Sequence, residues 1–128
     1  MTNDIPGLGA GIETLRAAAL RYPETVEGVA CEGTPIEKRT IRAGGKAFLF
    51  LGRGDVMVKL AESTDEVARL AAEQPGRFNI GARGWVTVKF SAEQPPPFDL
   101  LERWAGESYR LMANKRMLAL LAEGDQLP

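Results

Sequence analysis

Residues 37–60 read EKRTIRAGGKAFLFLGRGDVMVKL, and this stretch decides the fold. Three short runs rich in β-branched, aromatic and aliphatic residues, 37–42, 46–51 and 56–60, are separated by two glycine-containing turns. Turns this short join antiparallel neighbours, because a parallel connection needs a dozen or more residues. The stretch therefore predicts an antiparallel meander.

A further strand is expected at residues 85–90, where apolar and other side chains alternate without a break. The even-numbered residues of this run are apolar and are expected to face a core. The opposite face carries Trp85, Thr87 and Lys89. Upstream, residues 24–31 predict an edge strand and residues 77–84 a glycine-rich irregular segment.

Helical spacing of apolar residues appears outside the strands. A helix is expected from Ile12 to Tyr22, where apolar residues recur every three or four positions before Pro23. A short helix is expected after Ser63, because Ser63 and Glu66 have the spacing of a capping box.

The C-terminal region predicts a long helix that starts at Asp99 and runs to about Ala122. Residues 1–10 and 123–128 are expected to be flexible ends of a single domain that spans residues 1–128. The order of elements predicts a two-layer α+β fold, in which an antiparallel sheet carries the N- and C-terminal helices on one face.

The composition excludes several classes of protein. The 128 residues are 45% hydrophobic and 26% charged, with 16 basic against 17 acidic residues, which is typical of a soluble globular domain. The absence of histidine excludes a Ser-His-Asp or Cys-His site and any histidine metal ligand. The only cysteine, Cys31, cannot form an internal disulfide, so we expect a cytoplasmic protein with Cys31 as a buried apolar residue.

No segment has the pattern of an export signal or of a membrane span, so no membrane association is expected. Glycines at 44 and 45 before Lys46 indicate a hairpin turn, because a phosphate loop would need a hydroxyl where Ala47 stands. Ser108 lies on the long helix, where its hydroxyl can bond back to the preceding turn. No spacing unites an acid, a base and a nucleophile, so we expect neither enzymatic activity nor a metal or other cofactor.

The charge distribution is the most informative functional feature. Residues 38–60 contain six basic residues against one acidic residue, and residues 77–90 contain three basic residues and no acidic one. Because the whole chain has a net charge of -1, the helices and termini must be acidic. A basic sheet face with an exposed tryptophan is suited to phosphates and bases. The nucleic-acid-binding candidates are Arg42, Lys46, Arg53, Lys59, Arg83, Trp85 and Lys89.

Four segments together resemble the MmcQ/YjbR-like family over roughly residues 12–116. They are Gly45-Lys46-Ala47-Phe48, Val58-Lys59-Leu60, Gly84-Trp85-Val86-Thr87-Val88, and Glu107-Ser108-Tyr109-Arg110-Leu111 with Lys115 after it. The resemblance implies an α+β fold similar to frataxin and to the "double wing" DNA-binding domain of a phage transcription factor. It implies a DNA-binding role by similarity of fold, and it marks Ser108, Tyr109 and Lys115 as family positions of unknown role.

Three functional hypotheses stay open at this point. The leading one is a non-enzymatic protein whose sheet face contacts DNA mainly through phosphates, with short hairpin turns that limit insertion into a groove. The second is a regulatory module, monomeric or weakly dimeric, that binds an acidic protein partner or itself through a sheet edge. The third is a small-molecule pocket between sheet and helices that involves Trp85, Trp104 and Tyr109.

Overall fold

A computed structural model describes residues 8–35, 37–91 and 93–125 of the chain. Its elements in order are α1 Leu8–Leu20, β1 Thr25–Ala30, β2 Lys38–Ala43, β3 Lys46–Leu51, β4 Asp55–Lys59, α2 Thr64–Glu73, β5 Phe78–Ile80, the 3-10 turn η1 Ala82–Gly84, β6 Trp85–Lys89, α3 Phe98–Met112 and α4 Lys115–Asp125.

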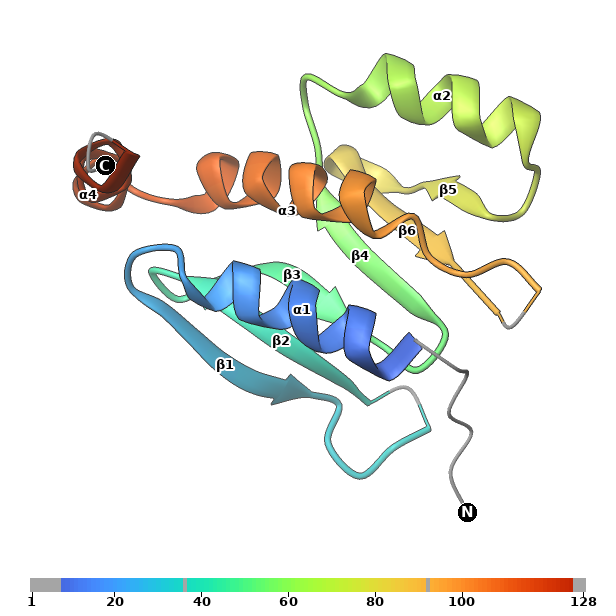
Figure 1. The fold of residues 1–128 in the computed structure, drawn as a ribbon, viewed down its shortest axis with the longest axis horizontal. Coiled ribbons are helices and arrows are strands. Elements are labelled where there is room, and N and C mark those ends of the chain that lie inside the picture. Colours follow the sequence, from blue (N-terminus) through green and yellow to red (C-terminus); the bar gives the residue numbers. More distant parts are fainter. Residues whose placement is uncertain (1–7, 36, 92, 126–128) are drawn as a thin grey trace.

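The six strands form one antiparallel sheet in the order β1-β2-β3-β4-β6-β5 (Figure 1). Strands β1 to β4 follow the chain as a meander, and α2 interrupts the sequence before β5 and β6 complete the sheet. The α+β fold expected from the sequence is confirmed, as is the predicted antiparallel meander.

One face of the sheet packs into the hydrophobic core. Val56 and Val58 on β4 and Val86 and Val88 on β6 are completely buried. These residues pair directly across the two strands, so their side chains share a face. The alternation predicted for residues 85–90 is therefore confirmed, with Phe90 also buried.

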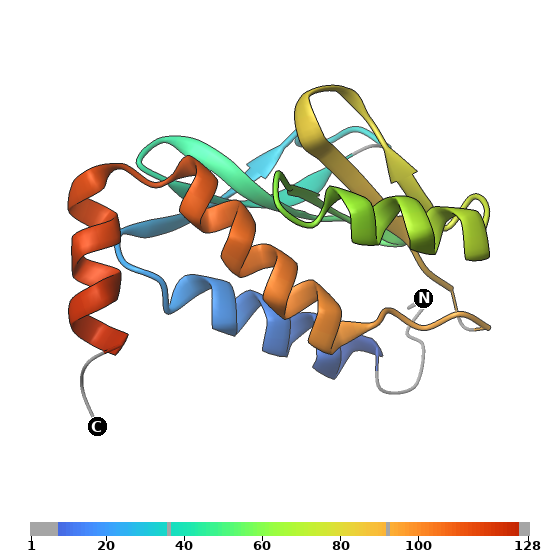
Figure 2. The same ribbon diagram turned by 90° about the horizontal axis from the view of Figure 1, so that it is seen from above.

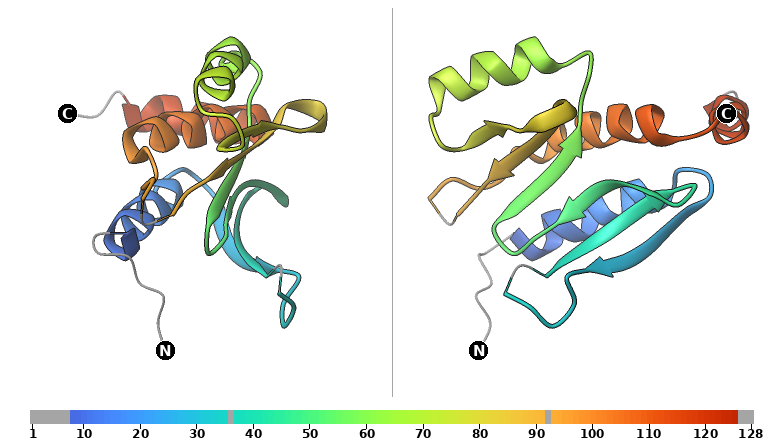
Figure 3. Two further views of the ribbon diagram at one scale, coloured as in Figure 1. Left: turned by 90° about the vertical axis from the view of Figure 1, so that its right-hand side faces the viewer. Right: turned by 180° about the vertical axis from the view of Figure 1, so that it is seen from behind.

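Helices α1 and α3 lie on that face, and α4 lies beyond the end of α3 (Figures 2 and 3). Helix α3 contacts α1, β3 and β4, and α2 packs over β5. Trp104 and Tyr109 on α3 are completely buried, and Tyr109 stacks on Tyr22 with ring centroids 4.6 Å apart. The expectation that the N- and C-terminal helices cover one sheet face is confirmed.

A bulge in the β2–β3 pair separates two neighbouring phenylalanines. Ile41 pairs with Leu49, but the next residue, Arg42, pairs with Ala47, so β3 has one extra residue between the two pairs. That residue, Phe48, is completely buried beside Leu49, whereas Phe50 is half-buried on the other face. The bulge thus supplies one aromatic ring to each side of the sheet.

Two regions differ from the sequence-based expectations. Residues 78–80 form the edge strand β5 instead of irregular chain, because Phe78 and Ile80 find partners on β6. The expected long helix ends at Met112, since Ala113 adopts an extended conformation with a ψ of 147°. A new helix starts at Lys115, and the Asn114 Oδ1 accepts a hydrogen bond from the Met117 N–H.

The ends of the described chain and its cysteine also differ. Helix α1 begins at Leu8 and α4 runs to Asp125, so helical structure reaches into both ends that were expected to be flexible; residues 1–7 and 126–128 lie outside the described residues. Cys31 is exposed, not buried, because it occupies a turn after β1 with a φ of 55°. None of the described helices is long and apolar enough to cross a membrane.

Candidate nucleic-acid interface

The face of the sheet opposite the helices, called the outer face here, carries its side chains in three rows that cross the strands. The first row is Ala30, Lys38, Asp55 and Lys89. The middle row is Gly28, Thr40, Phe50, Met57, Thr87 and Asn79. The third row is Val26, Arg42, Lys59 and Trp85. Two rows with cations therefore enclose an uncharged middle row.

The cations selected from the sequence are unpaired. Within the part of the chain that the structure describes, no hydrogen bond or ion pair engages the charged groups of Arg42, Arg53, Lys59, Arg83 and Lys89, nor that of Lys46. Other basic residues of the same segments have partners. Arg39 contacts Glu13 and Glu27 on the helix side, and Arg77 donates to Gln74 and to the Pro95 carbonyl.

The structure brings most of the candidates together. Arg42, Lys59, Trp85 and Lys89 lie on the outer face. Arg53 lies in the β3–β4 turn and Arg83 in η1, at opposite ends of that face. Lys46 stands apart, because it pairs with the buried Ala43 and so lies on the helix-covered side of its hairpin.

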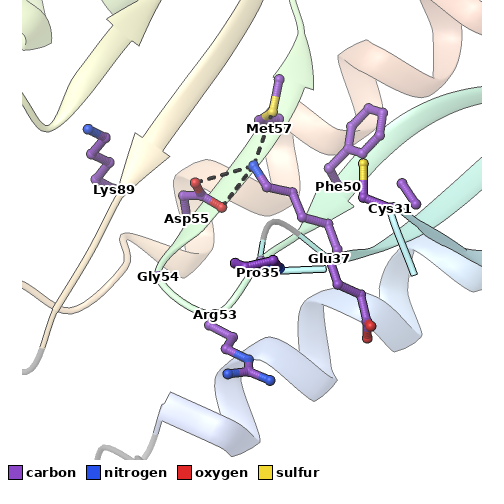
Figure 4. Close-up of a pocket in the computed structure, with 12 residues that line it drawn as sticks. Cys31, Pro35, Glu37, Phe50, Arg53, Gly54, Asp55, Met57 and Lys89 are labelled. Atoms are coloured by element: carbon purple, nitrogen blue, oxygen red, sulfur yellow. Dashed lines mark hydrogen bonds and ion pairs between the residues drawn. The ribbon is translucent and has the colours of Figure 1, made fainter. Parts of the chain in front are cut away.

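A groove about 650 Å³ in volume opens at the first-row end of the outer face (Figure 4). It is lined by Pro35, Phe50 and Met57 on its apolar side and by Arg53 and Lys89 among its charged residues. Figure 4 shows Phe50 and Cys31 toward one side, with Lys89 and Arg53 at separate edges. This groove could not be predicted from the sequence, because its lining residues come from the β1–β2 region, from the β3–β4 region and from β6.

An ion pair lies in this groove. The Lys38 Nζ is 3.2 Å from the Asp55 Oδ1 and 3.5 Å from the Met57 Sδ (Figure 4, dashed lines). The Lys38 and Asp55 side chains are only 22% and 26% exposed. Asp55 is the only acidic residue in the three rows, so its pairing with Lys38 leaves the outer face with a net positive charge from the other cations.

Two aromatic rings meet on the outer face above β4. Phe50 comes from β3 and Trp85 from β6, and their ring centroids are 5.5 Å apart in an edge-to-face arrangement. Both side chains are half-buried, unlike Trp104 and Tyr109 in the core. Trp85 thus lies among the cations, whereas the pocket between sheet and helices considered for Trp104 and Tyr109 is filled by packed side chains.

The two family positions on α3, Ser108 and Tyr109, bond to the sheet and to the segment before β1. The Ser108 hydroxyl is buried, donates to the Phe48 carbonyl at 2.6 Å and accepts from the Lys59 N–H at 2.9 Å. It therefore bonds two strands of the sheet, whereas the sequence analysis expected a bond to the preceding helical turn. The Tyr109 hydroxyl donates to the Pro23 carbonyl at 2.8 Å. Lys115 is exposed at the start of α4.

Glu107 caps helix α2 from a distant part of the chain. Its carboxylate accepts hydrogen bonds from the backbone N–H groups of Ala61, Glu62 and Ser63 and from the Ser63 hydroxyl, with distances between 2.5 and 3.2 Å. The expected Ser63–Glu66 capping box is wrong, because Ser63 makes no side-chain cap bond and Glu66 accepts instead from Arg103 and Trp104 on α3.

This cap makes stability depend on pH. Burial raises the pKa of Glu107, but the four hydrogen bonds to its carboxylate outweigh burial and hold that pKa below its ordinary value. A group whose pKa is lowered by folding stabilises the fold above its unfolded pKa, and that contribution disappears as the pH falls through the folded pKa. We expect Glu107→Gln to cost about 1 to 2 kcal/mol at neutral pH, the difference between charged and neutral hydrogen bonds.

Urea unfolding at several pH values measures this effect. The stability difference between Glu107→Gln and the wild-type chain should shrink as the pH falls below about 4.5. The control is Glu102→Gln, an exposed carboxylate on the same helix, which should change stability little at any pH. A difference for Glu107→Gln that stays constant with pH would contradict the capping role.

The described part of the chain holds no group of three or more cysteine or acidic side chains placed to bind a metal ion. The fold and the site together define a small α+β protein with an open sheet face that bears unpaired cations and two aromatic rings. The chain belongs to the YjbR family, whose model matches residues 20–111. No curated protein and no solved structure matches it.

The family match runs from the end of α1 to the end of α3 and so includes the whole sheet. Lys46, Lys59, Trp85, Ser108 and Tyr109 fall inside it, and Lys115 lies outside.

Proposed function

We propose that this protein binds DNA through the outer face, with phosphates as the main contacts and without catalysis. The observation that supports the proposal most is the set of unpaired cations on an uncovered face: Arg42, Lys59 and Lys89 in the two outer rows, with Arg53 and Arg83 at its ends. Cations without intramolecular partners can take phosphate oxygens and release the counterions that DNA carries.

The geometry favours this face over the rest of the molecule. Helix α3 and its neighbours cover the opposite face, where several cations have carboxylate partners: Arg16 contacts Glu27 and Arg103 contacts Glu66. The outer face differs in that its unpaired cations lie on one uncovered sheet surface beside two aromatic rings, where a polyanion can contact several of them together. We place this role in the cytoplasm, where a chain with a single exposed cysteine can remain reduced.

Fluorescence anisotropy with labelled single-stranded and duplex DNA tests the proposal. With four or five phosphate contacts, log affinity should fall with log salt at a slope of about -3 for single strands to about -4.5 for duplex, so binding should weaken roughly fifty- to five-hundredfold between about 50 and 200 mM salt. Absence of binding to either form of DNA at low salt, or an affinity that does not change with salt concentration, would contradict the proposed DNA binding. The acidic protein partner would then be the hypothesis to test.

A further inference from the structure

We propose that the groove on the outer face takes an unpaired base, so that the protein prefers single-stranded DNA to duplex. This inference rests on the proposed function and makes it more specific. It starts from a mismatch between the groove and phosphates: a phosphate needs only cations, whereas this groove also has an apolar side formed by Pro35, Phe50 and Met57.

The groove suits a flat, partly apolar group. Its volume of about 650 Å³ lies in the range of pockets that bind small organic ligands. Phe50 presents a half-buried aromatic ring there, and Trp85 supports that ring edge-on from the neighbouring side. Every base has a π-face that can stack on such a ring, and stacking of this kind tolerates any sequence.

The ion pair in the groove matches the edge of a base. Lys38 has an ammonium group with three donors, and the Asp55 carboxylate has several acceptor positions, of which the pair uses only some. Base edges present donors and acceptors side by side, so a neighbouring amine and carboxylate can bond to the same base. An apolar wall with a donor and an acceptor beside it is the chemistry that an unpaired base requires.

The cations are placed for the phosphates on either side of such a base. Arg53 and Lys89 line the groove itself, and Arg42 and Lys59 lie in the third row, four residues along their strands from Lys38 and Asp55. A strand laid over the uncharged middle row would therefore have cations along both of its sides. This arrangement is the charged track with aromatic platforms by which proteins hold single strands.

A duplex cannot use the same features. Its bases are stacked on one another, so their π-faces are unavailable to Phe50 unless a base leaves the stack. Two of the hairpin turns of this sheet are also short: residues 44–45 join β2 to β3, and residues 52–54 join β3 to β4, whereas residues 31–37 join β1 to β2. Turns of two or three residues project too little to reach base edges inside a groove, so at these two turns a duplex would engage cations alone.

The test compares three labelled oligonucleotides with equal numbers of phosphates per strand by anisotropy at one low salt concentration. They are oligo-dT of about 20 nucleotides, an abasic strand of the same length, and a duplex of that length. We expect oligo-dT to bind at least about fivefold more tightly than either of the others, the lower limit of what one stacked base contributes. Equal binding of oligo-dT and the abasic strand, or tighter binding of duplex, would overturn the inference and leave the proposed function in place.

A variant connects the preference to the groove. Phe50→Leu keeps an apolar side chain but removes the ring, and it should lower oligo-dT binding to the level of the abasic strand. Phe98→Leu is the matched control, because Phe98 is an equally half-buried phenylalanine on the helix side, and it should leave binding unchanged. A full preference for oligo-dT in Phe50→Leu would overturn the assignment to this groove. Failure of all three oligonucleotides to bind the wild-type chain would overturn the proposed function itself.

Discussion

Trp104→Ala is expected to destabilise the protein by about 3 to 5 kcal/mol, the usual cost of removing a buried tryptophan. Trp104 is completely buried, meets the Phe78 ring edge-on at 6.1 Å, and donates its indole N–H to Glu66 at 3.0 Å. Its removal leaves a cavity where α2, α3 and β5 meet, and it leaves the Glu66 carboxylate with one donor fewer. Urea unfolding followed by far-UV circular dichroism measures the loss without relying on tryptophan emission.

Trp85→Ala is the matched control for this experiment. The Trp85 ring is half-buried on the outer face, and Phe50 is the one aromatic ring that it contacts in the described chain, so its loss should cost only about 1 kcal/mol. The same variant should weaken the binding of single-stranded DNA. Trp104→Ala should not, because Trp104 is buried in the core and does not reach the outer face. Equal stability losses in the two variants would contradict the assignment of one tryptophan to the core and the other to the interface.

Gly84→Ala is expected to cost about 2 to 5 kcal/mol through strain and overpacking together. Gly84 has a φ of 84°, where a residue with a side chain is strained, and a Cβ atom there would lie 2.3 Å from the Leu60 carbonyl oxygen. The two backbones are held together by a hydrogen bond from the Leu60 N–H to the Gly84 carbonyl, 2.9 Å long. The clash involves backbone on both sides, so neither segment can move without breaking the end of the β4–β6 pair.

Gly76→Ala separates the two causes. Gly76 has the same φ of 84°, but no atom lies within 4 Å of the position its Cβ would take. It should therefore show only the conformational cost, about 1 to 2 kcal/mol. Thermal or urea unfolding of both variants provides the comparison. A Gly84→Ala variant no less stable than Gly76→Ala would show that the close approach to Leu60 has no energetic consequence.

The sheet was predictable from sequence where one face is uniformly apolar. Residues 85–90 and 56–60 alternate because Val56, Val58, Val86 and Val88 all face the same core, and this pattern needs no knowledge of the partner strands. Strand β5 has only three residues in a glycine-rich segment, and its pairing with β6 supplies the reason for it to be a strand. The break at Ala113 was missed because no proline or glycine marks it.

Side-chain partners distant in sequence explain the other differences. The capping box failed because Arg103 and Trp104 recruit Glu66, and because Glu107 reaches the α2 N-terminus in place of Ser63. Local spacing contains no information about such tertiary competition. Ser108 likewise finds acceptor and donor groups on two strands that pass under its helix.

The candidate interface was partly predictable. Alternation alone assigns Trp85 and Lys89 to one face, and charge counting identifies the basic segments, but it does not distinguish the unpaired cations from Lys38, Arg39 and Arg77, which have partners in the structure. The groove was not predictable, because it depends on Lys38 reaching Asp55 across β3 and on Phe50 reaching Trp85 across β4. The bulge that turns Phe50 outward and Phe48 inward breaks the simple alternation of β3.

The measurement that tests the outer face most directly is the DNA affinity of two double charge reversals, determined by anisotropy over a range of salt. Lys59→Glu with Lys89→Glu changes the outer face, and Arg21→Glu with Lys115→Glu makes the same change in net charge at exposed positions away from it. We predict that the first pair weakens binding at least about tenfold and lowers the salt slope by about 2, because each phosphate contact contributes about 1 to that slope. The second pair should leave both quantities nearly unchanged, and an equal loss in the two variants would contradict DNA binding by the outer face.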